Sequence, residues 1–348
     1  MINLYTPDGW IDVPSLEEGA LTFNVGYGAR GIGKTFGFLA DCLLDHPRRF
    51  LLLRRSQVQA DLIASSEFSP FRAIDRKRGS LTALKRINRY LTGVYKGILS
   101  DDGRVIPEGP PAGYVAALAS IHNIRGYDMD VDEMILDEFC PEKLERQIRD
   151  EFDVYRNAYE TINRNRELEG RAPIRAWLLS NSNMLANNYF IGLRIVETVD
   201  RMTRQKREIW RDEKRGLMII NFCNSPISKR KAETALYQLT PDDRFTGMAL
   251  NNEFSHESRS RTGSLPLREL LPLVQIGELQ IYRHKGSRQL YGSLHRSGSP
   301  DVYSTDDAGI ARFCSRYDWL WDEYMDDHIL WQSYLPEVLF RRFFNAGY

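Results

Sequence analysis

Residues 28 to 35 read Gly28-Ala29-Arg30-Gly31-Ile32-Gly33-Lys34-Thr35, which fits the phosphate-binding pattern G-x-x-x-x-G-K-[ST]. The glycines let the backbone wrap tightly and present N–H groups to an anion, and Lys34 can reach the β- and γ-phosphates of a nucleotide. The hydroxyl of Thr35 is a suitable ligand for Mg²⁺. The segment therefore predicts a nucleoside triphosphate site that these eight residues line.

The residues on both sides of this loop have the patterns of a strand and a helix. Residues 21–26 are apolar and β-branched, which predicts a buried strand that runs into the loop. From Lys34 to Leu44, apolar residues recur at helical spacing, and the positive end of that helix would face bound phosphates. Strand, glycine-rich loop and helix in this order distinguish a phosphate-binding loop from a chance match.

The bulk composition indicates a globular protein that uses local charge for any contact with a polyanion. The chain has 348 residues, enough for two domains, with 42% hydrophobic and 27% charged residues and a formal net charge of zero. No apolar run approaches 18 residues and no signal peptide is recognisable. The cysteines are far apart and predict reduced thiols in a cytoplasmic protein: Cys42, Cys140, Cys223 and Cys314.

A second motif, Met134-Ile135-Leu136-Asp137-Glu138-Phe139, is an apolar strand that ends in two carboxylates. Ligands of open α/β sheets bind at the carboxyl ends of the strands. There, Asp137 is suited to hold Mg²⁺ and Glu138 to orient and deprotonate an attacking water. The alternative is a solvated acidic turn. The adjacent pair favours a hydrolase that supplies its own base from the Mg²⁺-binding strand.

A third strand, residues 174–181, ends in Ser180-Asn181. The amide of Asn181 could hydrogen-bond the γ-phosphate or the attacking water, and a plain polar turn is the alternative. Strands that alternate with helices predict a mainly parallel sheet over residues 1–200. We further expect a strand at 49–55, helices at 58–78 and 141–169, strands at 90–98 and 113–119, and a turn at 107–113.

Several arginines are candidates to stabilise charge on a transferred phosphoryl group, a role often filled from a neighbouring subunit. Arg164 and Arg166 lie at the end of the expected long helix, and Arg125 lies before the acidic strand. Arg54 and Arg55 close the second strand and could contact nucleotide or polymer. Surface arginines and a solvated strand end are the respective alternatives.

The chain becomes basic after residue 200 and β-rich near its end. Residues 201–231 hold ten Lys or Arg and three Asp or Glu, a local charge of about +7. This run and residues 76–89 could face phosphate backbones, or could be solvated faces. We divide the chain into an ATPase domain at 1–200, a basic connector at 201–254 and a third part at 255–348. In that part we expect strands at 279–283, 289–294 and 301–304 and a helix at 329–344.

Taken together, the motifs resemble those of the DNA-packaging ATPases of phi29-like tailed phages, small relatives of the large terminases. The resemblance rests on segments that occur in one order and is specific over residues 20–190. They are residues 23–35, 51–55 with the paired arginines, 135–139, 163–167, 179–181, 188–190 and 251–254.

This resemblance implies an additional-strand, catalytic-glutamate type of P-loop NTPase with a smaller α+β C-terminal domain like a degenerate ribonuclease H-like nuclease. It implies ATP and Mg²⁺ as cofactors, a homo-oligomeric ring, pentameric in the family, at the portal of a prohead, double-stranded DNA as the polymer and, in some members, a packaging RNA. Such a protein works in the host cytoplasm, does not remain in the mature virion and has no membrane contact. By motif, Arg164 corresponds best to the family's trans-acting arginine, and Arg125 to a second one.

The sequence therefore predicts an ATP-driven translocase of double-stranded DNA with intersubunit ATP sites. Arg30 inside the loop fits such a site, because large terminases often carry a basic residue there. Residues 76–86 and 201–215 are the candidate DNA-gripping segments. Beyond residue 255 the carboxylates cluster around turns and a helix, so we expect no nuclease activity. The alternatives are a complete terminase with a working nuclease, and a nucleotide-binding switch or scaffold that moves nothing.

Overall fold

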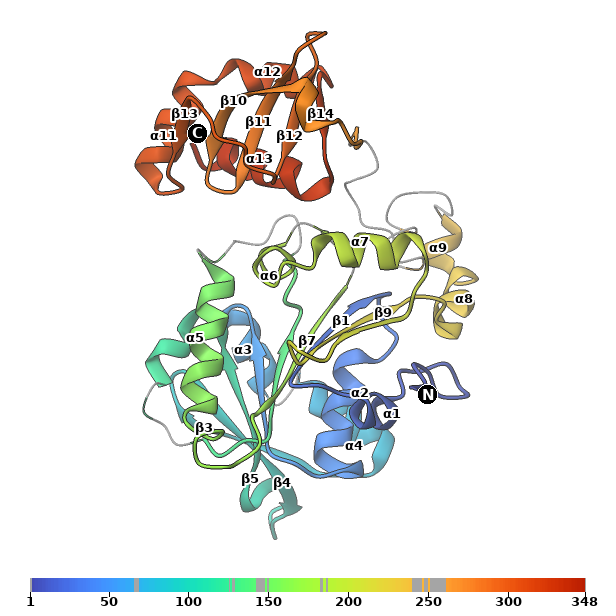
Figure 1. The fold of residues 1–348 in the computed structure, drawn as a ribbon. Coiled ribbons are helices and arrows are strands. Elements are labelled where there is room, and N and C mark those ends of the chain that lie inside the picture. Colours follow the sequence, from blue (N-terminus) through green and yellow to red (C-terminus); the bar gives the residue numbers. More distant parts are fainter. Residues whose placement is uncertain are drawn as a thin grey trace. The chain divides into compact units, whose positions relative to one another are not determined.

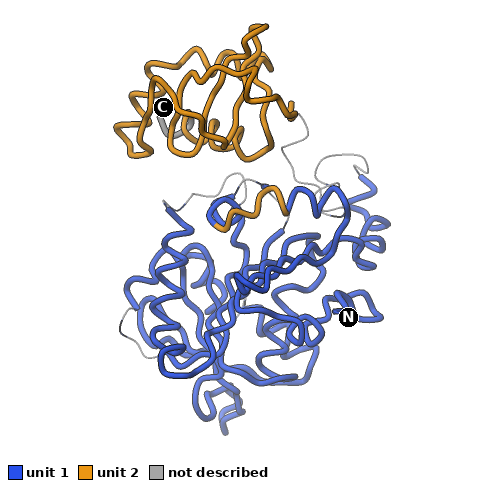
Figure 2. The backbone as a smooth tube through the Cα atoms, in the orientation of Figure 1, with its two compact units in different colours: residues 1–192, 199–255 blue, residues 193–198, 256–348 orange. Residues whose placement is uncertain are grey.

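The computed structural model describes residues 2–65, 69–124, 126, 129–141, 148, 150–181, 184–185, 187–239, 246, 250 and 261–347. Two compact units make up the chain (Figure 2). The first comprises residues 1–192 and 199–255, and the second comprises residues 193–198 and 256–348.

The first unit is built on a nine-stranded sheet with the order β3-β4-β5-β2-β6-β7-β1-β9-β8 (Figure 1). All contacts from β5 to β9 in this order are parallel, and β3, β4 and β8 add antiparallel edges. The expected mainly parallel α/β sheet is thus confirmed. The strands are β1 Phe23–Gly28, β2 Phe50–Arg54, β3 Thr82–Asn88, β4 Leu91–Leu99, β5 Val105–Ala117, β6 Glu133–Asp137, β7 Arg175–Asn181, β8 Ile209–Asp212 and β9 Leu217–Phe222.

Helices cover both faces of this sheet (Figure 1). On one face, Phe38 of α2 packs against Trp177 of β7 with ring centroids 4.5 Å apart. On the other face, Tyr159 of α5 packs against Phe23 of β1. The helices of this unit are α1 Val13–Glu18, α2 Lys34–Ala40 continued by the π-helical turn Asp41–Asp45, α3 Gln57–Ala64, α4 Pro70–Arg78, the 3-10 segment Leu118–Ile124, α5 Glu151–Asn163, α6 Asn188–Gly192, α8 Pro226–Ala232 and α9 Ala235–Leu239. Helix α7, Val196–Arg204, begins in the second unit and continues in the first from residue 199.

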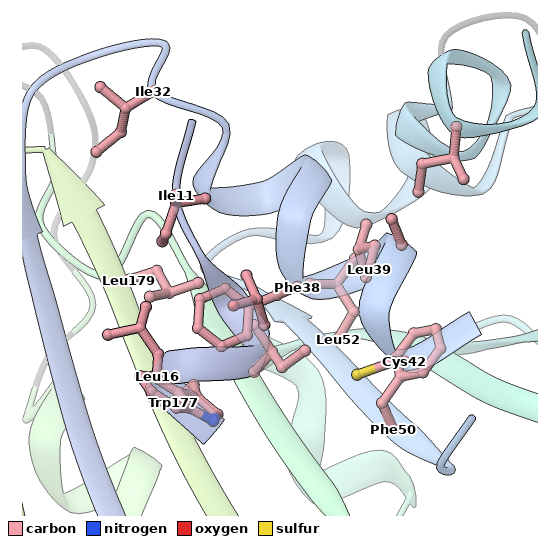
Figure 3. Packing of buried hydrophobic residues seen from close by; sticks show 14 of the residues in the cluster. Ile11, Leu16, Ile32, Phe38, Leu39, Cys42, Phe50, Leu52, Trp177 and Leu179 are labelled. Carbon is pink, nitrogen blue, oxygen red and sulfur yellow. The ribbon is translucent and has the colours of Figure 1, made fainter. Parts of the chain in front are cut away.

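A cluster of buried apolar side chains lies beneath α2, the helix that follows the phosphate loop. Phe38, Leu52, Trp177 and Leu179 are fully or almost fully buried in one cluster, and Figure 3 shows them side by side. Burying a large apolar side chain stabilises a fold by about 1.5–3 kcal/mol. These residues anchor helix α2, which follows the phosphate loop, to strands β2 and β7.

Two expected helices are shorter than the sequence pattern indicates. The expected helix at 58–78 is two helices, because α3 ends before Ser65, which is extended, and α4 starts after Ser69 with Pro70 in its first turn. Proline is tolerated there but not in a helix interior. The expected helix at 141–169 is limited to α5, since Asp150 and Arg164 at its two ends both have positive φ. Residues 142–147 lie outside the described residues.

The proline-rich segment at 107–113 is part of strand β5, and the expectation of a turn there was wrong. Pro107 pairs with Gly97 of β4, whereas β2 pairs with β5 only from Gly113 onward. The missing N–H of proline costs nothing along an edge that has no second neighbour. The turn lies at residues 100–104, where Gly103 has a φ of +76°.

The expected connector at 201–254 contributes two strands to the first unit's sheet. Strand β9 is fully buried and pairs in parallel with β1, and β8 pairs with β9 at the sheet edge. The run Leu217–Phe222 is a continuous apolar stretch of the kind that central parallel strands require. Basic residues lie on both sides of this strand, and they are the reason that the sequence predicts a basic connector here.

The second unit has a five-stranded sheet with the order β13-β10-β11-β12-β14. Strands β10, β11 and β12 are antiparallel, while β13 joins β10 and β14 joins β12 in parallel. The expected helix at 329–344 is a strand followed by a helix. The elements are β10 Leu270–Ile276, β11 Leu279–His284, β12 Leu290–Ser293, β13 Asp301–Tyr303, β14 Ile329–Trp331, the 3-10 turn Leu267–Glu269, α11 Asp307–Arg316, α12 Trp319–Met325 and α13 Tyr334–Gly347.

Candidate active site

The phosphate loop joins the end of β1 to the start of α2. Gly31 and Gly33 have φ angles of +68° and +91°, a region that glycine adopts without strain. Ala29 and Ile32 are fully buried and anchor the loop to the core. The backbone N–H of Ile11 donates to the carbonyl of Ile32 at 3.2 Å. The loop is thus shaped by glycine at its turns and held by apolar side chains between them.

Lys34 is buried at the base of the loop. Its Nζ donates to the carbonyls of Gly28 and Ala29 at 3.3 and 2.7 Å and to Oδ1 of Asn181 at 3.1 Å. Burial lowers the pKa of Lys34 to about 7, although Asp137 and Glu138 oppose this shift. These three hydrogen-bond acceptors are neutral, so the ammonium group could replace them with the oxygens of a bound anion.

Thr35, in the helix that follows β1, contacts Asp137 at the end of β6, although β1 and β6 are not neighbours in the sheet. The Thr35 hydroxyl donates to Oδ2 of Asp137 at 2.7 Å. Strand β7 lies between β1 and β6, so the carboxyl ends of three parallel strands converge here. The hydroxyl and the carboxylate present the hard oxygen ligands that Mg²⁺ prefers.

Glu138 follows β6 with a φ of +59°, and its N–H donates to the carbonyl of Leu179 at 2.7 Å. The side chain of Glu138 is 48% exposed, whereas that of Asp137 is 3% exposed. Arg54 bridges the two carboxylates, bonding Oδ2 of Asp137 at 2.7 Å and Oε2 of Glu138. Asp137 is thus buried and Glu138 is accessible to solvent, and Arg54 at the end of β2 contacts both carboxylates.

Arg55 has a different role from its neighbour. It is 3% exposed and donates to both carboxylate oxygens of Glu151 at 2.7 and 2.9 Å. The hydroxyl of Tyr189 donates to Oε1 of the same carboxylate at 3.2 Å. This buried ion pair joins β2, α5 and α6 directly beside Arg54, and the alternative of a solvated strand end is wrong for it.

Asn181 ends β7 and pairs in register with Gly28 of the phosphate loop. Its side chain reaches Lys34, as described above. Ser180 points elsewhere, and its hydroxyl accepts from the N–H of Cys140 at 3.2 Å. The sequence-predicted residues of the loop, the acidic pair and Asn181 thus come together at one edge of the sheet.

Arg164 and Arg166 lie at the amino ends of the parallel strands, opposite the carboxyl ends that hold the phosphate loop. Helix α5 runs back from the end of β6 toward the start of β7, and Oδ1 of Asn163 accepts from the N–H of Ile174 just before β7. Arg166 donates to the carbonyl of Val131, just before β6. Arg164 directly follows Asn163 and is exposed, so it lies at the amino ends of the strands, away from the phosphate loop of its own chain. Arg125 lies outside the described residues.

The first basic segment, residues 76–86, comprises the end of α4, a turn and most of strand β3. Arg86 pairs with Asp61 at 2.6 Å, Arg78 pairs with Asp45, and Lys77 lies over the rings of Trp10 and Phe36.

In the second basic segment, residues 201–215, the basic side chains are all exposed. Arg204 and Arg211 have acidic partners, Asp200 and Glu213, each at 2.7 Å. Both salt bridges lie at the surface, where such pairs are weak and exchangeable.

Two acidic residues of the second unit cap its helices. Asp306 caps α11 and Asp318 caps α12 through backbone N–H groups. Among strands β10 to β14 the one carboxylate belongs to Asp301, which bonds Tyr317 at 2.5 Å and pairs with Arg316. In the part of the chain that is described, no three His, Cys, Asp or Glu side chains form a group able to hold a metal ion.

Two contributors to the loop were missed from the sequence. Lys231 of α8 donates to the carbonyl of Arg30 at 2.8 Å, and no local pattern marks it within a basic run. The N-terminal segment around Ile11 also holds the loop. The paired arginines at the end of β2 were a signal for Arg54, but their spacing does not say which one faces the acidic pair.

No family model matches the chain, and no curated protein matches it. Among solved structures, the Phi-28 gp11 DNA packaging motor aligns with 100% of this chain and 98% of its own, at 17% identity and a TM-score of 0.59. The ATPase domain of the Thermus phage P74-26 large terminase aligns with 67% of this chain and 89% of its own, at 14% identity and a TM-score of 0.38. The large terminase of a thermophilic bacteriophage aligns with 94% of this chain and 86% of its own, at 11% identity and a TM-score of 0.40.

The last two TM-scores are too low to establish a shared fold, and the first carries the comparison. Within the described residues, no helix has the length and apolar character that a membrane span needs. The resemblance to phi29-like packaging ATPases is confirmed at the level of fold. The chain is similar over its whole length to a DNA packaging motor of known structure.

Proposed function

We propose that this chain is the ATP-driven motor that moves double-stranded DNA into a prohead. The observation that carries the proposal is the meeting of Lys34, Thr35, Asp137 and Glu138 at the carboxyl ends of β1 and β6. This edge of a parallel sheet is where nucleotides bind. The fold shared with the Phi-28 gp11 DNA packaging motor supports DNA as the transported polymer.

The residues present fit ATP and Mg²⁺. Lys34 and the glycine-rich loop would hold the phosphates, and the oxygens of Thr35 and Asp137, in contact at 2.7 Å, would hold the metal. One carboxylate and one hydroxyl suffice, because Mg²⁺ usually takes further ligands from water and substrate phosphates. When bound, the metal would neutralise charge that develops on the phosphate oxygens.

Glu138 would act as the general base. Strand β7 separates β1 from β6, which supports the additional-strand, catalytic-glutamate class. The Glu138 side chain is 48% exposed beside Arg54, so an attacking water could reach its carboxylate. Asn181, bonded to Lys34 at 3.1 Å, would sense the γ-phosphate.

Substitutions in the site test the hydrolysis. Glu138→Gln should retain ATP binding and lose DNA-stimulated turnover by about 10²-fold or more, because it removes a general base. Lys34→Ala should lose binding as well. Glu169→Gln, an exposed glutamate, is the matched control. Undiminished turnover in Glu138→Gln would exclude its role, and an absence of turnover in the wild type would exclude the function.

Arg164 would act on the site of a neighbouring subunit in a ring, for which we propose a pentamer. Its place at the amino ends of the strands, opposite the phosphate loop, supports action in the site of a neighbouring copy. Arg125 is the second candidate. If the site is shared, Arg164→Ala and Lys34→Ala should each be inactive alone and regain turnover when mixed. Turnover that stays absent on mixing would contradict a shared site in which Arg164 is the partner's group.

DNA contact is assigned to the exposed basic segment 201–215, with residues 76–86 as the second candidate. Reversing the charges of Arg201, Lys206 and Arg207 should abolish packaging and spare basal ATP turnover, because these exposed groups lie outside the described ATP site. The same reversal at Arg76 and Lys85 provides the comparison. Packaging that survives both sets would remove both segments from consideration.

The second unit would be a vestigial nuclease-like domain without activity. Its antiparallel strands with a parallel neighbour and packed helices are compatible with a ribonuclease H-like fold. A single strand carboxylate, Asp301, falls short of the paired acids that metal-dependent cleavage uses. Cleavage of plasmid in Mn²⁺ would contradict this. We place the working protein in the host cytoplasm at the prohead portal, with a packaging RNA as a further possible partner.

A further inference from the structure

Lys231 joins helix α8 to the phosphate loop across 201 positions of sequence. It lies in the last turn of α8, and its Nζ donates to the carbonyl of Arg30 at 2.8 Å. The side chain passes directly over Gly31, where an added β-carbon would overlap the ammonium group. Gly31 therefore provides both the positive φ of the loop and the room for Lys231.

The base of α8 is fixed against the N-terminal segment that also holds the loop. Gly9, with a φ of +87°, lies against Pro226 and Ile227 at the start of α8. The hydroxyl of Tyr5 donates to the carbonyl of Cys223 at 2.9 Å, just before α8. Lys231 thus reaches the loop from a helix that is itself held in place.

Lys231 adds a third cation to the loop. Burial and the guanidinium of Arg30 lower the pKa of Lys231. Arg30 and Lys231 together contribute to the low pKa of Lys34. Three cations gathered around one loop repel one another, and a polyphosphate anion would relieve that repulsion.

We propose that Lys231 is a positioning residue of the phosphate loop and couples helix α8 to nucleotide binding. This inference rests on the proposed ATP site. By holding the Arg30 carbonyl, Lys231 keeps the loop in the conformation that receives phosphates. Coupling between two sites is reciprocal, so a bound nucleotide must in turn stabilise α8 through the same contact.

Hydrogen exchange of the nucleotide-free protein tests the contact itself. In Lys231→Met, the peptide that covers residues 28–35 should exchange roughly 3- to 10-fold faster, the loss expected for one hydrogen bond. Lys229→Met is the matched control, because Lys229 is exposed on the same helix. Lys231→Arg keeps a donor and should restore most of the protection. Equal exchange in Lys231→Met and Lys229→Met would overturn the proposal.

Exchange with bound ADP tests the coupling. In the wild type and in Lys229→Met, ADP should slow exchange across α8, and in Lys231→Met that protection should disappear while the Kd for ADP rises roughly 3- to 10-fold. Unchanged protection of α8 in Lys231→Met would overturn the coupling. If the wild type binds neither ADP nor ATP, the proposed function fails, and the nucleotide-free comparison still decides whether Lys231 positions the loop.

Discussion

At the scale of single residues, the protonation of Lys34 is the property most open to measurement. In the folded protein, burial lowers the pKa of the Lys34 ammonium group to about 7, whereas a lysine in the unfolded chain has a pKa above 10. A bound polyphosphate favours the ammonium form. Nucleotide binding at pH 8 should therefore take up a proton, approaching one per site, and the uptake should fall toward zero at pH 6.

Calorimetric titrations with an ATP analogue in two buffers of different ionisation enthalpy measure this uptake. Lys231→Met provides the comparison, because it retains Lys34 and removes one neighbouring cation. Its Lys34 should titrate at higher pH, so the uptake at pH 8 should be smaller. Binding enthalpies that are identical in both buffers at pH 8 would show that Lys34 is already charged in the free protein.

Single residues also show what the sequence could predict about the site. The phosphate loop, Asp137 and Glu138 were predicted because the chemistry of each is carried by adjacent residues in one motif. Lys231 and Arg54 could not be assigned, since their roles depend on which element the tertiary fold places beside the loop. Arg164 was expected from its motif, but only the course of α5 shows that it lies at the far edge of the sheet.

At the scale of elements, the buried pair Arg55–Glu151 locks β2 to α5 beside the acidic site. Arg55→Ala should destabilise the first unit by about 3–5 kcal/mol, because it leaves the Glu151 carboxylate buried without its cation. Arg156→Ala breaks an exposed pair with Asp153 and should cost at most about 1 kcal/mol. Denaturant unfolding measures both, and equal midpoints would contradict this assignment.

A second cluster of charged side chains links α1, the turn after α2 and the start of β6, at the amino ends of the parallel strands. Arg48 contacts Asp41, Glu133 and Glu17, and burial together with the Glu133 carboxylate raises the pKa of Glu17 to about 8. Between pH 5 and 7 the folded protein therefore holds a proton that the unfolded chain has released. Stability should fall as the pH rises through this window, by up to about 1.4 kcal/mol per pH unit.

Glu17→Gln isolates this effect, because the amide cannot titrate. Its unfolding midpoint should depend less on pH between 5 and 7 than that of the wild type. Lys34 acts in the opposite direction only above pH 7, so the two groups do not overlap in this window. If the unfolding midpoints of the wild type and of Glu17→Gln change with pH in parallel, the group that titrates is not Glu17.

Two strands show why local sequence patterns do not predict every element of the fold. The segment 107–113 looks like a turn because of its prolines, yet it forms a strand where β5 extends beyond β2 and needs no second partner. Strand β9 was hidden by the basic residues around it, although its six buried residues place it next to β1. In both cases the neighbouring strand decides, and no local window contains it.

At the scale of the whole molecule, the proposed motor would use an ATP site in the first unit to move DNA. In the proposed ring, the phosphate loop would supply one side of that site, and Arg164, at the amino ends of the strands, would act in a neighbouring copy. If this proposal holds, the chain must assemble before it can turn over ATP rapidly. Specific ATPase activity should therefore rise with protein concentration.

Protection of DNA from nuclease inside cognate proheads tests the central claim most directly. With wild-type protein and ATP, full-length DNA should become protected, and no protection should appear without ATP or with Glu138→Gln, whereas Glu169→Gln should behave as the wild type. Protection that Glu138→Gln supports as well as the wild type, or ATP turnover by the wild type with no DNA protected, would contradict the account.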